Sequence, residues 1–223
     1  KDSTSIELDG PYEIKPRNIT VASDPSSAAF FIVGALIIPN SFITLKNVAL
    51  NKTRIAFIDV LKKMGGKIKI QKTKTVSGED VGNIKVHYSS LKGIKIKSSY
   101  SPYLIDEYPI LAIAASQARG FTIMKGLSEL RHKESDRIKS ITTNLSKIGF
   151  KVISKKDDIF IKGSNELQVI DQKKIKTYGD HRIAMSFTIL SLLYKNKLII
   201  DDDSCISISY PDFKKHLKKL STH

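Results

Sequence analysis

Residues 24–39 read DPSSAAFFIVGALIIP, and this stretch is the clearest indication of how the chain folds. Asp24 is a good N-cap residue, and Pro25 falls at the first helical position, where its missing N–H costs nothing. From Ala28 onward the segment is apolar on nearly every side, which is typical of a helix buried all round. It is too short to span a membrane, so it predicts a helix at the centre of a protein core.

The residues on either side of this helix predict a small α/β unit. Residues 18–23 read as a strand before it, and FITLKNV (42–48) as a strand after it. The segment TRIAFIDVLKKMGG (53–66) has apolar residues at helical spacing and ends on two glycines, which indicates an amphipathic helix. Two further strands follow, KIKIQK (67–72) and GNIKVHY (82–88).

The same order of elements then recurs along the chain. A second copy has strands at 92–99, 121–127, 150–156 and 158–163, an apolar helix at 108–118 and an amphipathic helix from Lys133 to Ile148. A shorter third copy has strands at 175–179 and 197–201, with helices at 181–194 and 211–220.

Such self-similarity predicts one α/β (α+β) domain of three repeated βαβαββ-like units around a pseudo-threefold axis. The three apolar helices should lie buried side by side, and the sheets should face outward. An ordinary α/β domain with accidental similarity is the alternative.

Composition limits the possible classes of protein. Of the 223 residues, 41% are hydrophobic, which supports a real core and argues against disorder. The single cysteine excludes a disulfide framework or a multi-cysteine metal site, and a reducing cytoplasm is the expected location. The sequence offers no apolar run of membrane-spanning length and no signal-peptide pattern. Its first residue is Lys, as in a chain that begins inside a longer protein.

The net charge of +15 suggests a nucleic-acid partner at first sight. The lysines are spread along the whole chain, however, and aromatic residues do not alternate with them as stacking platforms would. We therefore expect no nucleic-acid partner, although a basic module that binds RNA or another polyanion stays open as the alternative from another class. Arginine, which suits bidentate binding of carboxylate and phosphate, occurs six times: Arg17, Arg54, Arg119, Arg131, Arg137 and Arg182.

One candidate site lies in LRHKESDRI (130–138), which follows a strand and begins a predicted helix. Lys133 and Arg137 would share a helix face, with Glu134 at its edge. Two cations beside a carboxylate could bind an anion and exchange a proton with it. The alternative is a solvated helix with ordinary surface salt bridges.

A second candidate is YGDHRIAM (178–185), in which Asp180 caps a helix and His181 and Arg182 lie in its first turn. Helix N-termini favour anions, so a cation here suggests a purpose beyond stability. The alternative is a capped helix with a surface His–Arg pair. Asp106, in YLIDEYP (103–109), is a third candidate, although a residue before an apolar helix can be only its cap.

These stretches resemble a known family. LRHKESDRI is similar to the LR-x-KE-[ST]-DRI signature of 5-enolpyruvylshikimate-3-phosphate synthases, and YGDHRIAMSF to their GDHR-[IM]-AM signature. The segments at 23–37, 51–66 and 104–120 resemble the intervening parts, so the similarity runs from about Asn18 to the C-terminus.

The resemblance implies an enolpyruvyl transferase fold with two similar domains and substrates in the cleft between them. Residues 18–223 would form the C-terminal domain, and residues 1–17 a lead-in that belongs with the missing N-terminal domain. The implied reaction, a step of the shikimate pathway, joins the 5-hydroxyl of shikimate 3-phosphate to carbon 2 of phosphoenolpyruvate and expels phosphate. It implies a cytoplasmic monomer with no cofactor, no metal and no membrane partner, and this domain alone should be inactive.

Roles for individual residues also follow from the resemblance. Asp106 matches the base at the 5-hydroxyl, Glu134 the acid at the methylene carbon, and Lys133 a residue beside both substrates. Arg137 and Arg182 match the arginines that bind phosphoenolpyruvate, and His181 lines the same site. A transferase of the same fold with another acceptor remains open.

One position departs from the pattern. Many family members carry a lysine before the last helix, in a stretch like CTSKTFPDYF. Here the stretch is CISISYPDF (205–213), and Ile208 stands at the lysine position. The cation is therefore dispensable in this branch or supplied by a neighbour.

Overall fold

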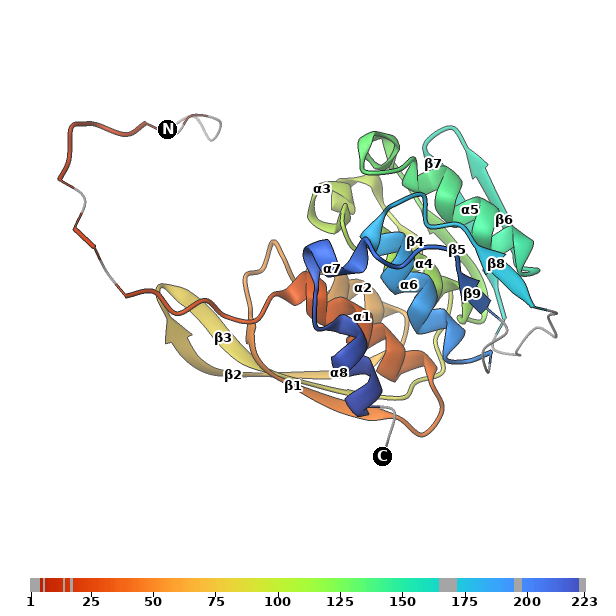
Figure 1. The fold of residues 1–223 in the computed structure, drawn as a ribbon, viewed down its shortest axis with the longest axis horizontal. Helices are drawn as coiled ribbons and strands as arrows, with labels where there is room; N and C mark the ends of the chain where they lie inside the picture. Colours follow the sequence, from red (N-terminus) through yellow and green to blue (C-terminus); the bar gives the residue numbers. More distant parts are fainter. Residues whose placement is uncertain are drawn as a thin grey trace.

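The computed structural model describes residues 5, 7–13, 15–16, 18–164, 172–194 and 198–220. Its centre is formed by three helices that contact one another, α1 (Pro25–Ile37), α4 (Tyr108–Ser116) and α6 (His181–Ser191) (Figure 1). All of α4 and nearly all of α1 are buried, as their apolar sequences require. The predicted side-by-side packing of the three apolar helices is therefore confirmed.

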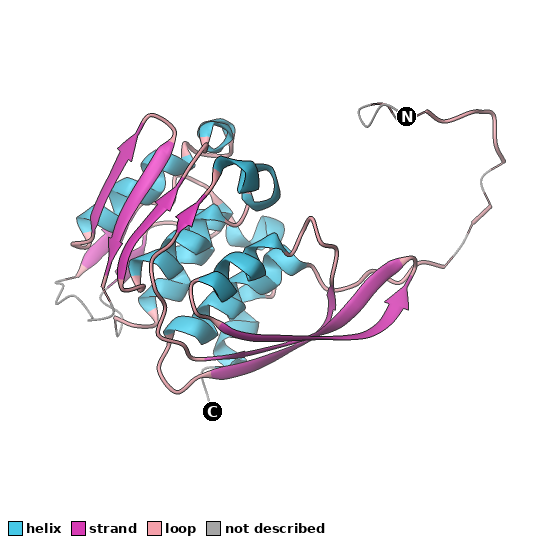
Figure 2. Ribbon diagram, turned by 180° about the vertical axis from the view of Figure 1, so that it is seen from behind, coloured by secondary structure: helices cyan, strands magenta, loops and turns pink. Residues whose placement is uncertain are grey.

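The first unit adds β1 (Phe42–Ala49), α2 (Ala56–Lys63), β2 (Lys67–Val76) and β3 (Glu79–His87). The strands form an antiparallel sheet of order β1-β3-β2. Ile84 and Val86 of the central strand point into the core, while the lysines of β2 point outward. Figure 2 shows this sheet and that of the second unit on the outside of the helices.

The second unit contains β4 (Lys95–Ile96), η1 (Ser98–Tyr100), α3 (Ser101–Leu104), α4, β5 (Gly120–Met124), η2 (Ser128–His132), α5 (Arg137–Lys147), β6 (Lys151–Lys155) and β7 (Asp158–Gly163). Its sheet has the order β4-β5-β7-β6, and β4 pairs with β5 in parallel. The third unit contains β8 (Lys173–Ile175), α6, β9 (Leu198–Ile200), α7 (Ile206–Ser209) and α8 (Phe213–Leu220). β8 and β9 pair in parallel.

Three predictions about the elements were wrong. The strand expected at 175–179 lies earlier, as β8 at Lys173–Ile175, because Tyr178 and Gly179 form the turn that precedes α6. The strand expected at residues 18–23 is reduced to one parallel bridge between Ser23 and Val48, because Ile19 and Val21 bury almost nothing and stay 73% and 87% exposed. The helix expected from Lys133 begins at Arg137 instead. Asp136 is extended and accepts a hydrogen bond from the backbone N–H of Lys139 at 3.0 Å, so it caps the helix there.

Part of the predicted lead-in lies outside the described residues, namely Lys1 to Thr4, Ile6, Ile14 and Arg17, as does Lys197 of the third unit. The division of the chain at residue 17 stays a prediction.

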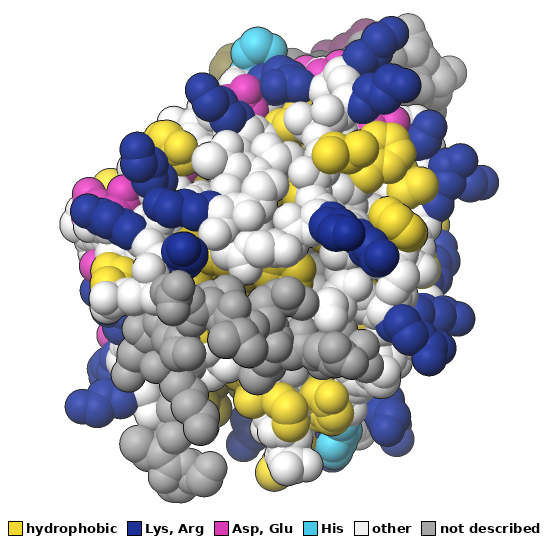
Figure 3. Space-filling model, turned by 90° about the vertical axis from the view of Figure 1, so that its right-hand side faces the viewer, with side chains coloured by type: hydrophobic (Ala, Val, Ile, Leu, Met, Phe, Trp, Pro, Cys, Tyr) yellow, Lys and Arg dark blue, Asp and Glu magenta, His cyan; other side chains and the backbone are white. Residues whose placement is uncertain are grey.

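On one face of the domain (Figure 3), charged side chains do not form a single patch. On the face that Figure 3 shows, lysine and arginine side chains are scattered among uncharged and apolar ones. Within the ranges described above, no helix combines the length and the apolar character that a membrane span needs.

Candidate active site

The N-terminal ends of the three core helices meet at one end of the domain. Ser26 of α1 donates a hydrogen bond to Glu107, at the start of α4, over 2.6 Å. The Glu107 carboxylate in turn lies 3.7 Å from the guanidinium of Arg182 in the first turn of α6. Helix N-termini carry partial positive charge and unpaired N–H groups, so this end of the domain favours anions.

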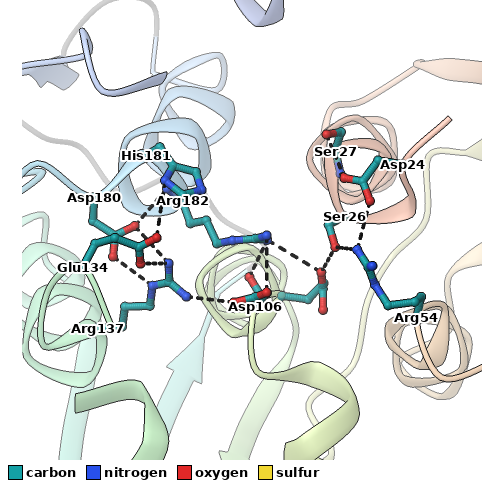
Figure 4. Close-up of polar contacts among 11 residues, drawn as sticks. Asp24, Ser26, Ser27, Arg54, Asp106, Glu134, Arg137, Asp180, His181 and Arg182 are labelled. Carbon is teal, nitrogen blue, oxygen red and sulfur yellow. Dashed lines mark hydrogen bonds and ion pairs between the residues drawn. The ribbon is translucent and has the colours of Figure 1, made fainter. Parts of the chain in front are cut away.

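Arg137 is the centre of the polar cluster at this end (Figure 4). Its side chain is fully buried, yet every branch of its guanidinium faces a carboxylate. The Nε atom donates to Asp180 over 2.8 Å, Nη1 donates to Asp106 over 3.2 Å, and Nη2 donates to Glu134. A buried charge of this kind is tolerated only when it is paired.

Asp180 has two functions in the cluster. As predicted, it caps α6, because its side chain accepts hydrogen bonds from the backbone N–H groups of Arg182 and Ile183. It is also fully buried against Arg137, and it therefore fixes α5 to the start of α6.

Arg182 lies between two carboxylates. Its Nη1 donates to the backbone carbonyl of Asp106 over 3.0 Å, and its Nη2 lies 3.5 Å from the Asp106 carboxylate. Asp106 is not the cap of α4, because Glu107 occupies that position. The Asp106 side chain instead faces both arginines, so the cap interpretation was wrong.

The charges around Asp106 and His181 set their protonation. Burial raises the pKa of Asp106, but Arg182, Arg137 and Lys133 together outweigh it and hold that pKa below its ordinary value. Burial and the neighbouring Arg182 lower the pKa of His181, against the opposing charge of Glu134. Near neutral pH, Asp106 is therefore ionised and His181 is mostly neutral.

The structure brings five of the six predicted residues into one network: Asp106, Glu134, Arg137, His181 and Arg182. The Nδ1 atom of His181 lies 3.8 Å from Glu134. Lys133 lies in the exposed segment before α5, so it does not share a helix face with Arg137, but its charge acts on Asp106. The side chains of Asp106 and Glu134 are 41% and 47% exposed, so the cluster opens to solvent on the carboxylate side.

Sequence reasoning missed three contributors: Ser26, Glu107 and the Arg137-binding role of Asp180. Arg54 was noted only as one of six arginines, and its hydrogen bond to Ser26 over 3.0 Å was not predicted. Glu107 was the most detectable, because it is a carboxylate beside an otherwise apolar helix. Ile208, at the position of the family's lysine, is 86% exposed. In the described part of the chain, no three His, Cys, Asp or Glu side chains are grouped so as to hold a metal ion.

Comparison with known proteins shows one family along nearly the whole chain. Residues 1–217 match the family described as EPSP synthase (3-phosphoshikimate 1-carboxyvinyltransferase). A 3-phosphoshikimate 1-carboxyvinyltransferase of Petrotoga mobilis is 44% identical over 220 residues, which cover 99% of this chain and 50% of the relative. Another 3-phosphoshikimate 1-carboxyvinyltransferase, from Thermoanaerobacter sp., is 42% identical, and the match covers 98% of this chain and 51% of that relative. The chain thus spans about half the length of the curated relatives it matches.

Solved structures give the same result. An EPSP synthase of Acinetobacter baumannii superposes with a TM-score of 0.85 at 33% identity, over 96% of this chain and 49% of that one. The enolpyruvyl transferase NikO of Streptomyces tendae has a TM-score of 0.67 at 12% identity, over 91% and 44%, and shares the fold. The chain belongs to the EPSP synthase family of enolpyruvyl transferases.

Proposed function

We propose that this chain forms the phosphoenolpyruvate-binding half of an enzyme that transfers the enolpyruvyl group to the 5-hydroxyl of shikimate 3-phosphate and releases phosphate. The observation that carries the proposal is the pairing of Arg137 and Arg182 with the same carboxylate, Asp106, at the joined helix N-termini. The names of the relatives support the choice of substrates.

The reaction needs groups that move protons in both of its stages. In the first stage the hydroxyl oxygen bonds to carbon 2 of phosphoenolpyruvate, its proton passes to a base, and a proton adds to the methylene carbon. In the second stage a proton leaves the new methyl group and the bond to phosphate breaks. The lowered pKa of Asp106 keeps it ionised and able to accept the hydroxyl proton. Glu134, on the exposed side of the cluster, is the proposed donor to the methylene carbon.

The cations have separate tasks in this proposal. Arg182, with 14% of its side chain exposed, is the arginine placed to meet an anionic substrate directly. Arg137 is enclosed by Asp106, Glu134 and Asp180, so it contacts phosphoenolpyruvate only where the ligand displaces one of the two exposed carboxylates. Lys133 lies in the exposed segment before α5, where its ammonium adds positive charge beside both substrates.

The second substrate is assigned to another domain. Because the chain spans about half of its relatives, we propose that the remaining half supplies the contacts to shikimate 3-phosphate and that the complete enzyme is a monomer. Catalysis of this kind depends on holding both reactants together, so the 223-residue chain alone should be inactive.

The test is a phosphate-release assay with both substrates. The chain alone should give no release above background, and the chain joined to the first half of the Petrotoga mobilis relative should restore it. Turnover by the chain alone would show that the proposed division of the site is wrong. Absence of turnover in a joined protein that is folded and binds shikimate 3-phosphate would contradict the proposed reaction.

A further inference from the structure

A buried carboxylate lies directly behind the candidate active site. Glu107 is 4% exposed and occupies the N-cap position of α4, but its side chain makes no capping hydrogen bond. Burial raises the pKa of Glu107. The hydrogen bond from Ser26 and the charge of Arg182 lower that pKa, but burial outweighs them. A buried ion pair is weak support for stability, so this carboxylate calls for another explanation.

Glu107 is also held by residues at the N-terminal end of α1. Ser26 donates to its Oε1 atom over 2.6 Å. Arg54 of the first unit donates to Ser26 over 3.0 Å and to Asp24 over another 3.0 Å. The Glu107 carboxylate is therefore fixed by the N-terminal end of α1 before it meets Arg182.

Arg182 is divided between this fixed carboxylate and Asp106. Its Nη1 lies 3.7 Å from Glu107 Oε1, and its Nη2 lies 3.5 Å from Asp106 Oδ2. Both distances are longer than the usual hydrogen bond between charged groups. The attraction between charges grows as their separation falls, so removal of one carboxylate lets the guanidinium close on the other.

We propose that Glu107 is a positioning residue that holds the Arg182 guanidinium away from the carboxylate of Asp106, so that both groups stay available to the substrates. This inference rests on the proposed function, because it concerns the arginine assigned to phosphoenolpyruvate. Without the Glu107 charge, Arg182 pairs fully with Asp106, and the substrate meets neither a free arginine nor a free base.

Glu107→Gln isolates the charge from the packing. Glutamine has nearly the same volume and can still accept the hydrogen bond from Ser26, but it cannot form an ion pair with Arg182. Loss of a negative charge also makes the site more attractive to anions in general. This general attraction acts at a distance, whereas pairing of Arg182 with Asp106 occupies the hydrogen-bond donors of Arg182 directly. The pairing should therefore have the larger effect on the affinity for phosphoenolpyruvate.

The experiment uses the 223-residue chain and needs no ligand for its first reading. The ¹⁵N signals of the Arg182 guanidinium are compared between wild type and Glu107→Gln, and phosphoenolpyruvate is then titrated into each. We expect shifted Arg182 signals and a Kd for phosphoenolpyruvate that rises about tenfold. Asn144→Ala is the matched control, since Asn144 is 1% exposed and its side chain bonds the backbone at Lys176 rather than Arg182.

Ser26→Ala provides a second variant should Glu107→Gln fail to fold. It releases Glu107 from Ser26, so the carboxylate can approach Arg182, and the Arg182 signals should move in the direction opposite to that in Glu107→Gln. Unchanged Arg182 signals in the folded variant, or tighter binding of phosphoenolpyruvate, would overturn the proposal. A wild-type chain that binds no phosphoenolpyruvate would count against the proposed function, while the Arg182 signals would still decide the positioning role.

Discussion

Arg137 is a residue whose replacement should strongly destabilise the fold. Its guanidinium is fully buried and reaches three carboxylates at once, with Nε at 2.8 Å from the equally buried Asp180. Lysine at this position keeps the charge but loses the planar fork and the Nε donor. Asp180 then keeps its backbone partners and Ser135 but loses the hydrogen bond from Nε. Loss of a hydrogen bond between charged groups costs about 1.5–3 kcal/mol, so Arg137→Lys should lower the free energy of unfolding by at least that amount.

Arg131 provides a matched control within the same motif. It also pairs with two carboxylates, Asp136 and Asp157, but its side chain is 35% exposed. Exposed pairs contribute up to about 1 kcal/mol, so Arg131→Lys should cost no more than that. Urea unfolding followed by circular dichroism measures both variants, with an unchanged m value as the sign that the unfolding reaction is the same. Equal losses in the two variants would refute the claim that Arg137 holds a buried network together.

Two further predictions concern acid stability and close packing. Because the pKa of His181 is lowered from 6.5, the unfolded chain binds this proton first as pH falls through that value. The free energy of unfolding should therefore fall on acidification from pH 7.5 to 5.5, and it should fall less in His181→Gln than in wild type or in the exposed-site control His132→Gln. Equal pH dependence in all three would contradict this. Gly34→Ala should raise the melting temperature, because the new Cβ would meet Ile189 at an ordinary 3.5 Å and alanine favours a helix by about 0.5–1 kcal/mol. Gly163→Ala should lower it, since the Cβ would fall 2.2 Å from the carbonyl oxygens of Ala115 and Ala118. The opposite order of melting temperatures would show that the packing described here is wrong.

The pattern of apolar residues along the sequence predicted the buried core well. The helices at 25–37 and 108–116 are apolar on nearly every side, and burial among other helices is the arrangement that suits such a surface. The strand at 18–23 was overpredicted because Ile19 and Val21 alternate correctly, but a strand also needs a neighbour to cover its side chains.

The site was only partly predictable. The motifs located Glu134, Arg137, His181 and Arg182, but the polar sequence around Arg137 gave no sign that its side chain would be fully buried. That burial depends on Asp106 and Asp180, which lie 31 and 43 residues away, and no local pattern reports such a contact. The same holds for Ser26 and Glu107, which are 81 residues apart in sequence.

The assignment of Arg182 to phosphoenolpyruvate is the central claim, and calorimetric titration tests it most directly. In the joined two-domain protein, Arg182→Lys keeps the charge and removes the fork of donors. The change should weaken the binding of phosphoenolpyruvate by about 1.5–3 kcal/mol, which is the range for hydrogen bonds to charged groups. This corresponds to a Kd that is roughly ten- to a hundredfold higher. Binding of shikimate 3-phosphate alone should change little. Equal weakening of both ligands, or of neither, would contradict the claim that this arginine binds phosphoenolpyruvate.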